Sequence, residues 1–525
     1  MRHRRFWVFL ALACVVASAA CAPSGSVAKA STLRVAIRRP SSLDPPLVKD
    51  PAGTLVDKQL FDTLVAVDPT TLALKPRLAI RWEVLDGGTR FVFHLRPKVR
   101  FNDGTTLTAD DVVFSLDRLA RKQTGSEVGF LLESIVGYAA VGVKATATEL
   151  EGLRAIDPST VEIKLTSAWF EFPYVLTHPA TAPVPKAAVT LDPVAFKDHP
   201  VGTGPYQVKG SLQPGADITL ERNRRYWGSA PAYQTVKLLI YEQTTGAYSD
   251  FEADRVDVSE VPSSSAEAAS RRYGTEGFGP LAAQLYLGFD IRRVRDIRLR
   301  RAVSMAIDRE AIAHSVFDDA MRPATSLIPQ GLPGRTEGSC GKLCEHRVAE
   351  ARALVTQTAA ESGVQPSIRF AYQSGEPQET MAKLIKAELE GIGISVQLAP
   401  LPLTDFLDSL QKGEVDMYRV GWVAEYPLAD WFVSGLFRTG STDNHFGYSA
   451  TDVDQAITAA RAQPRSRSSL KVYAALESRI TKDAVVVPIG SFRNRFVASS
   501  AVDGFYVDLE GTFEIARFKP AADDT

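Results

Sequence analysis

No single hydrophobic core can serve a chain of 525 residues, so this protein has to divide into two or three domains. Its composition is that of ordinary globular proteins, with 45% hydrophobic and 23% charged residues. The formal net charge is -1 at pH 7 and no long basic run occurs. The charge balance therefore gives no reason to expect a nucleic-acid partner.

Strand and helix patterns alternate along the chain, which predicts a mixed α/β fold. Period-two or continuous apolar patterns predict strands at 33–37, 91–95, 161–165 and 394–398. Helical spacing predicts a helix that starts near Thr108, two consecutive helices that start at Asp296 and Asp308, and a helix at 381–389. Thr108 is followed by Asp111 in the spacing of a capping box, and aspartates are good helix caps.

The first 21 residues have the layout of a bacterial export signal. Arginines precede an apolar run at residues 6–17, which is too short to span a bilayer, and small residues then lead to Cys21. A lipoprotein signal ends in such a cysteine, although Ser18 stands where Leu is usual. We predict a signal peptide at 1–21, lipidation of Cys21 and a flexible tether at 22–31, with plain secretion as the alternative. The folded part is then extracytoplasmic, on the outer face of the cell membrane.

After removal of the signal peptide and lipidation of Cys21, two cysteines remain, Cys340 and Cys344. An export compartment is oxidising and the pair lies in a glycine-rich stretch, which predicts a disulfide. The alternative is half of a metal site, but no second cysteine pair exists and His346 is the only nearby imidazole.

The usual motifs of catalysis are absent. The sequence contains no G-x-S-x-G, no H-E-x-x-H and no P-loop, and its histidines do not have zinc-ligand spacing. Residues 202–205 (GTGP) begin like a dinucleotide-binding fingerprint, but Pro205 and the missing third glycine favour a structural turn. We therefore expect no enzyme activity, no cofactor and no metal.

Six segments occur in a characteristic order between Leu33 and Phe518. They are 101–104 (FNDG) leading into 108–115 (TADDVVFS), 202–206 (GTGPY), 222–227 (RNRRYW), 287–290 (LGFD), 300–309 (RRAVSMAIDR) and 421–427 (GWVAEYP). In this order they resemble the extracytoplasmic solute-binding proteins of the peptide, oligopeptide and nickel class, family 5, which feed ABC importers.

This resemblance implies a two-lobed, periplasmic-binding-protein-like fold of the class II type with an additional domain inserted in the first lobe. It assigns 32–71, 201–284 and 498–525 to the first lobe, 72–200 to the additional domain and 285–497 to the second lobe. It also implies a monomer whose lobes close on a solute by hinge motion, in a form that a membrane permease recognises.

The resemblance also names two ligand contacts on either side of Trp422. In oligopeptide binders of this family, the acidic residue three positions after the Trp pairs with the ligand's α-ammonium, and an Arg three positions before it can pair with the carboxylate. Here these are Glu425 and Arg419, and an arginine offers a planar bidentate fork for a carboxylate. The usual acid is Asp, so the longer Glu425 moves the ammonium by about 1 Å. This departure weakens the peptide assignment.

Trp422, Tyr426, Asp430 and Trp431 complete the predicted ligand-binding set. Asp430 is what remains of the family's usual Asp-Pro-Asp-Asn, and Trp431 adds an aromatic ring. The alternatives are that both tryptophans belong to the core and that Arg419 pairs with a nearby surface acid, Asp416 or Glu414.

These observations favour a lipoprotein that captures peptides or peptide-like solutes and delivers them to an ABC permease. The main alternative is a receptor of the same fold for a nickel chelate, haem, an oligosaccharide or an amino-acid-derived metabolite. An exported enzyme would need titratable groups with perturbed pKa values in the cleft. A sensor or adhesion lipoprotein would bind a ligand without an importer.

Overall fold

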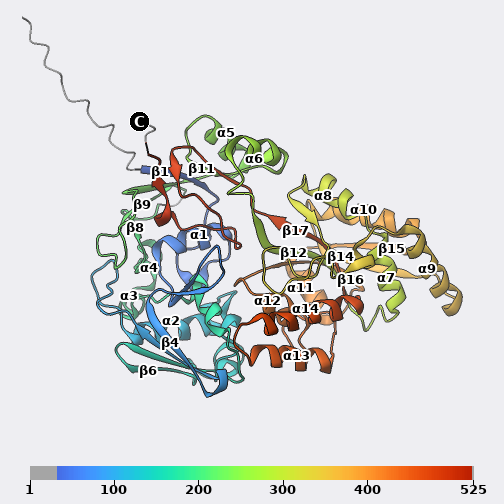
Figure 1. Cartoon of the computed structure of the whole chain (residues 1–525), viewed down its shortest axis with the longest axis horizontal. Coiled ribbons are helices and arrows are strands. Elements are labelled where there is room, and N and C mark those ends of the chain that lie inside the picture. The colour runs from blue at the N-terminus through green and yellow to red at the C-terminus, as the bar shows by residue number, and fades with distance from the viewer. Residues whose placement is uncertain (1–31, 214, 523–525) are drawn as a thin grey trace, which may run out of the picture.

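Residues 32–213 and 215–522 are described by the computed structural model of this chain, which is drawn in Figure 1. The predicted signal peptide, the tether and Cys21 lie outside these residues. Within the described residues, no helix combines the length and the apolar character that a bilayer crossing requires.

The first of two six-stranded sheets has the strand order β18-β11-β1-β10-β9-β8. β1 pairs in parallel with β10 and β11, and the other pairs are antiparallel. Leu33 and Val35 pack with α1, whereas Ala36 packs with α5 and α6, so the two faces of β1 are both covered. The elements are β1 (Thr32–Ile37), β8 (Tyr206–Val208), β9 (Ile218–Arg222), β10 (Thr235–Ile240), β11 (Val258–Glu260), β18 (Phe496–Ala498), α1 (Pro51–Leu60), α5 (Thr244–Glu252) and α6 (Ala266–Tyr273).

The second sheet has the order β13-β17-β12-β16-β14-β15 and also carries helices on both faces (Figure 1). Its strands are β12 (Pro280–Phe289), β13 (Met321–Pro323), β14 (Ser367–Gln373), β15 (Ser395–Leu401), β16 (Met417–Val423) and β17 (Val486–Arg493). One apolar cluster joins it to α7 (Ile297–Ala306), α8 (Arg309–Phe317), α9 (Val348–Ser362) and α10 (Gln378–Gly391). Another joins it to α11 (Leu403–Lys412), α12 (Ala429–Phe437), α13 (Thr451–Arg461) and α14 (Arg467–Lys482).

A four-stranded antiparallel sheet, β4-β5-β7-β6, lies in the chain between β1 and β8 of the first sheet. The helix α2 packs on it through Val112 and Leu116, which join Phe91 and Val161 in one apolar cluster. The elements between β1 and β8 are β2 (Val65–Val67), β3 (Leu74–Pro76), β4 (Ala79–Leu85), β5 (Arg90–Leu95), α2 (Ala109–Ala120), β6 (Leu153–Asp157), β7 (Thr160–Lys164), α3 (Lys186–Leu191) and α4 (Pro193–Asp198). A short pair, β19 (Val502–Asp503) and β20 (Lys519–Pro520), lies near the C-terminus.

The local predictions from the sequence are confirmed where the structure describes them. The predicted strands correspond to β1, β5, β7 and β15, and the predicted helices to α2, α7, α8 and α10. Asp296 and Asp308 each accept a hydrogen bond from the first turn of their helix. Gly202 and Gly204 have a structural role, because they pack against the end of α1 where an added Cβ would lie 2.1 Å and 2.4 Å from backbone atoms of Leu60.

Two chain segments cross side by side between the six-stranded sheets. The Asn494 amide donates to the Gly279 carbonyl (2.9 Å), and the Phe496 amide donates to the Gly277 carbonyl (3.0 Å). The lobe boundaries predicted after 284 and after 497 fall inside β12 and β18. A whole strand forms its hydrogen bonds within one sheet. Residues 280–284 of β12 therefore belong to the second sheet, and residues 496–497 of β18 belong to the first. The domain division as a whole stays a prediction.

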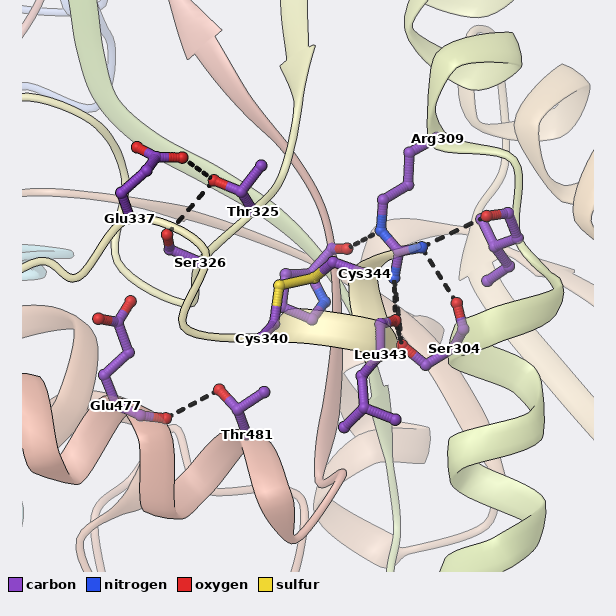
Figure 2. Close-up of a disulfide and its surroundings, with 12 residues drawn as sticks. Ser304, Arg309, Thr325, Ser326, Glu337, Cys340, Leu343, Cys344, Glu477 and Thr481 are labelled. Carbon is purple, nitrogen blue, oxygen red and sulfur yellow. Dashed lines mark hydrogen bonds between the residues drawn. A yellow bond between two sulfur atoms is a disulfide. The ribbon is translucent and has the colours of Figure 1, made fainter. Parts of the chain in front are cut away.

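A disulfide joins Cys340 and Cys344, whose Cα atoms lie 5.6 Å apart, beside the helix α7 (Figure 2). Within the enclosed turn, the Leu343 carbonyl accepts hydrogen bonds from Ser304 Oγ (2.5 Å) and Arg309 Nη2 (3.1 Å). Loss of water on burial lowers the pKa of Arg309 to about 10. Carbonyl and hydroxyl oxygens accept hydrogen bonds from its guanidinium and so partly replace that water. The disulfide therefore closes the turn that helps to hold a buried cation.

Candidate functional site

A cleft of about 370 Å³ lies between the start of α1, the end of β16 and the segment that carries the four-stranded sheet, which we call the inserted segment. Its size falls within the range of small-molecule sites in proteins. The side chains that line it come from distant parts of the chain, namely 48–51 and 54, 127, 128 and 130, 178 and 179, 423–425, and 510 and 512. Predicted ligand residue Glu425 is among them, in the loop that follows β16.

Most acidic side chains of this cleft already have partners. Lys49 Nζ lies 2.8 Å from a carboxylate oxygen of Glu127, and Lys58 Nζ lies 2.6 Å from Glu510. Asp50 caps α1 by accepting the Gly53 amide at 2.8 Å. Among the described residues, Glu425 alone of these four acids has neither a lysine or arginine partner nor a backbone donor.

The one polar contact that the structure gives the Glu425 carboxylate is with His178. His178 Nε2 lies 3.0 Å from Glu425 Oε2, and the side chains are 13% and 28% exposed. His178 precedes a short 3-10 helix at Pro179–Thr181 and accepts the Ala180 amide on Nδ1 (3.1 Å). An acidic group thus faces the cleft with part of its surface open.

Arg419 lies on β16 opposite Leu287 of β12, and its guanidinium forms no ion pair within the described residues. Its Nε is buried without a hydrogen-bond partner, and burial lowers the pKa of Arg419. Of the two acids proposed as its alternative partners, Asp416 instead contacts Arg293 at 2.7 Å. No pair with Glu414 occurs either, so no acid in the part of the chain that the structure describes neutralises this cation.

The predicted aromatic contacts pack against one another. Trp422 stacks on Trp431 at 5.2 Å, and Tyr426 meets Trp431 edge-on at 5.1 Å. The indole nitrogens donate to backbone carbonyls, from Trp422 to Trp431 (3.2 Å) and from Trp431 to Val423 (2.7 Å). Of the two tryptophans in the core alternative, Trp431 is buried and Trp422 is half-buried. Tyr426 is buried too, and contact of these rings with a ligand stays a prediction.

Asp430 is fully buried and serves as the centre of a polar network. Its carboxylate accepts from Arg461 Nη2 (2.6 Å) and Nε (2.9 Å), Ser434 Oγ (2.7 Å) and the Tyr473 hydroxyl (3.0 Å). Burial raises the pKa of Asp430, but the charge of Arg461 and these hydrogen bonds outweigh burial and leave the pKa below its usual value. The carboxylate therefore has a structural use that is independent of any ligand.

The inserted segment contacts the second-sheet half directly. The Arg461 guanidinium lies 4.3 Å from the centre of the Trp169 ring, and the Phe170 amide donates to the Arg461 carbonyl at 2.8 Å. Burial and then the charge of Asp430 raise the pKa of Glu171 to about 7, although Arg465 Nε lies 3.7 Å away. We call these contacts the closure face.

Sequence reasoning found Glu425 but missed the residues that face it. His178, Lys49 and Glu127 carry no motif, and only the three-dimensional fold brings them to one cleft. The described residues contain no cluster of three or more potential metal-ligating side chains.

The fold and cleft can now be compared with known proteins. The model of the bacterial extracellular solute-binding proteins, family 5 Middle, matches residues 73–444, which is more than half of the chain. The chain belongs to family 5 of these proteins. Solute-binding proteins of this family serve ABC importers, so the resemblance drawn from six sequence segments is confirmed.

Curated relatives of this family 5 protein include binding proteins for different solutes. The probable deoxycholate-binding periplasmic protein YgiS of Escherichia coli K12 is 28% identical over 463 residues, covering 86% of each chain. The periplasmic oligopeptide-binding protein OppA of Salmonella typhimurium is 28% identical over 491 residues, covering 88% of this chain and 87% of OppA. These relatives are periplasmic binding proteins rather than enzymes.

The solved structure of the Escherichia coli murein tripeptide binding protein MppA matches this protein with a TM-score of 0.75 at 23% identity. The match covers 94% of this chain and 99% of that chain. It confirms the predicted fold class of a two-lobed binding protein.

Proposed function

We propose that this protein captures peptides or peptide-like solutes outside the cytoplasm and delivers them to the permease of an ABC importer. The observation that carries the proposal is the Glu425 carboxylate, which lines the cleft without a lysine or arginine partner in the described structure. An amino group of a ligand would supply the missing cation.

Arg419 offers the complementary charge. Its guanidinium has no acidic partner among the described residues, and leaving a partly buried cation unpaired is unfavourable. Arg419 and Glu425 are six positions apart, so an extended chain separates their backbones by at most about 20 Å. A zwitterionic peptide of a few residues would place one charge near each of these side chains.

The first test compares Glu425→Gln with the wild-type protein by calorimetric titration of trialanine. Loss of a charged contact weakens binding by about 1.5–3 kcal/mol, or roughly ten- to hundred-fold in Kd. Glu127→Gln is the matched control, since Glu127 lines the same cleft but is paired with Lys49. Equal binding of trialanine and N-acetyl-trialanine by the wild-type protein would refute the ammonium contact.

The proposal includes a lipid anchor on Cys21, which lies outside the described residues. Cys21→Ser should move the protein from the membrane fraction to the soluble fraction without changing its ligand affinity. Retention of the variant in the membrane fraction would contradict the anchor. Co-purification of one defined non-peptide compound in place of mixed peptides would favour the specialised receptor instead.

A further inference from the structure

We propose that His178 is a positioning residue that orients the Glu425 carboxylate for a cationic group of the ligand, and that it does so from the opposite side of the cleft. The inference rests on the proposed function, in which Glu425 receives an amino group. It adds a second residue to the recognition of that group.

The two side chains belong to different halves of the molecule. His178 lies between two 3-10 helices, Phe172–Thr177 and Pro179–Thr181, and the second of these packs against α1 of the first-sheet half. Glu425 follows β16 of the second sheet. The 3.0 Å contact between His178 Nε2 and Glu425 Oε2 therefore spans the cleft.

The hydrogen bonding of His178 determines which ring nitrogen carries the proton. Nδ1 accepts the Ala180 amide hydrogen, so its lone pair must point at that amide. The ring proton then resides on Nε2, the atom that faces Glu425, and the imidazole is neutral. A neutral imidazole 3.0 Å from the Glu425 carboxylate limits the positions that the carboxylate can take and leaves its negative charge available, whereas a lysine or arginine would neutralise it.

The other charges around His178 are consistent with this arrangement. Glu510 is another carboxylate that lines the cleft with His178, and it is held by Lys58 at 2.6 Å. The Glu425 side chain stays 28% exposed, so its carboxylate can accept a donor from the cleft while it contacts His178. The oriented acceptor exists only when the two halves approach each other, which couples recognition of a cation to closure.

Two substitutions separate the two contacts of His178, the hydrogen bond from the Ala180 amide and the close contact with Glu425. Asparagine can replace Nδ1 as the acceptor of the Ala180 amide, as a good N-cap residue does, but is too short to reach Glu425. Glutamine reaches Glu425 with an amide donor but caps poorly. His178→Asn thus removes the contact with Glu425 and keeps the cap, and His178→Gln does the reverse.

Calorimetric titration with trialanine and N-acetyl-trialanine tests the proposal. We expect His178→Asn to weaken trialanine binding about ten-fold and to leave N-acetyl-trialanine unchanged, because one contact to a charged group is lost. His178→Gln should bind trialanine within about three-fold of wild type and unfold at a lower temperature than His178→Asn. An equal loss of affinity for both probes, or no loss, in His178→Asn would overturn the positioning role.

The same titrations distinguish this inference from the proposed function. If the wild-type protein prefers trialanine and Glu425→Gln loses that preference while His178→Asn keeps it, only the role of His178 is wrong. If the wild-type protein binds the two probes equally, or binds neither, the proposed ammonium contact fails and the inference fails with it.

Discussion

Replacement of Asp430 by asparagine should reduce the stability of the second lobe while leaving ligand affinity intact. Asp430 is fully buried and its two oxygens accept four hydrogen bonds, two of them from Arg461. Asp430→Asn removes the negative charge and leaves the buried Arg461 uncompensated. Breaking a buried pair in this way costs about 3–5 kcal/mol.

The assay is thermal unfolding monitored by calorimetry, together with titration of trialanine at a temperature at which the variant is folded. For a domain of roughly 150–250 residues, each kcal/mol shifts the melting temperature by about 2–4 °C, so the fall should be about 6–20 °C. Ser434→Ala is the matched control, because it removes one neutral donor to Asp430 and should cost only about 1 kcal/mol.

A double variant tests the cause of the loss. Asp430→Asn combined with Arg461→Met removes both charges, so it should be more stable than Asp430→Asn alone. If Asp430→Asn keeps wild-type stability but loses affinity for trialanine, the reasoning is refuted and Asp430 is a ligand contact, as the sequence predicted.

Glu171→Gln should flatten the dependence of stability on pH. Burial raises the pKa of Glu171 from 4.5 to about 7. The stability that this group contributes is therefore fully present below pH 4.5 and is lost as the pH rises through 7. The total loss in the free energy of unfolding is about 3 kcal/mol. Urea unfolding at pH 5 and pH 8 measures this loss of stability. Glu310→Gln, a change at an exposed residue, is the control and should keep the wild-type difference between the two pH values. If Glu171→Gln keeps that difference too, Glu171 is not its cause. Replacing Cys340 and Cys344 by serine should lower the unfolding free energy by about 2 kcal/mol, because the bond closes a loop of sequence separation 4. The affinity for trialanine should not change, because the described residues that line the cleft include neither cysteine. A loss of affinity would show that the turn closed by the disulfide influences the cleft.

The elements of the fold could be predicted because local patterns record them. The apolar run at residues 35–37 of β1 reflects a strand covered on both faces, and the caps Asp296 and Asp308 mark where helices begin. The placement of Glu425 at a cleft followed from the motif around Trp422. Local sequence thus gives each element its buried face.

The partners of the candidate site could not be predicted because docking between distant segments decides them. Arg461, which neutralises Asp430, lies 31 positions away along the chain, and no pattern near Asp430 signals it. His178 reaches Glu425 only because the inserted segment packs against the second-sheet half. Burial of Asp430 follows from the same packing, which a family motif does not encode.

The hydrogen-bonded pair of crossing segments at 277–279 and 494–496 has a consequence for affinity. Sliding one lobe past the other would break these backbone bonds, whereas bending both segments together would keep them, so rotation about one axis is the motion they permit. Under the proposed hinge motion, the closure face then sets the fraction of molecules that are shut before any solute arrives. A substitution that weakens the Arg461–Trp169 contact would lower that fraction and raise every Kd by the same factor, whatever the solute. Strength and selectivity of binding could thus evolve at separate places.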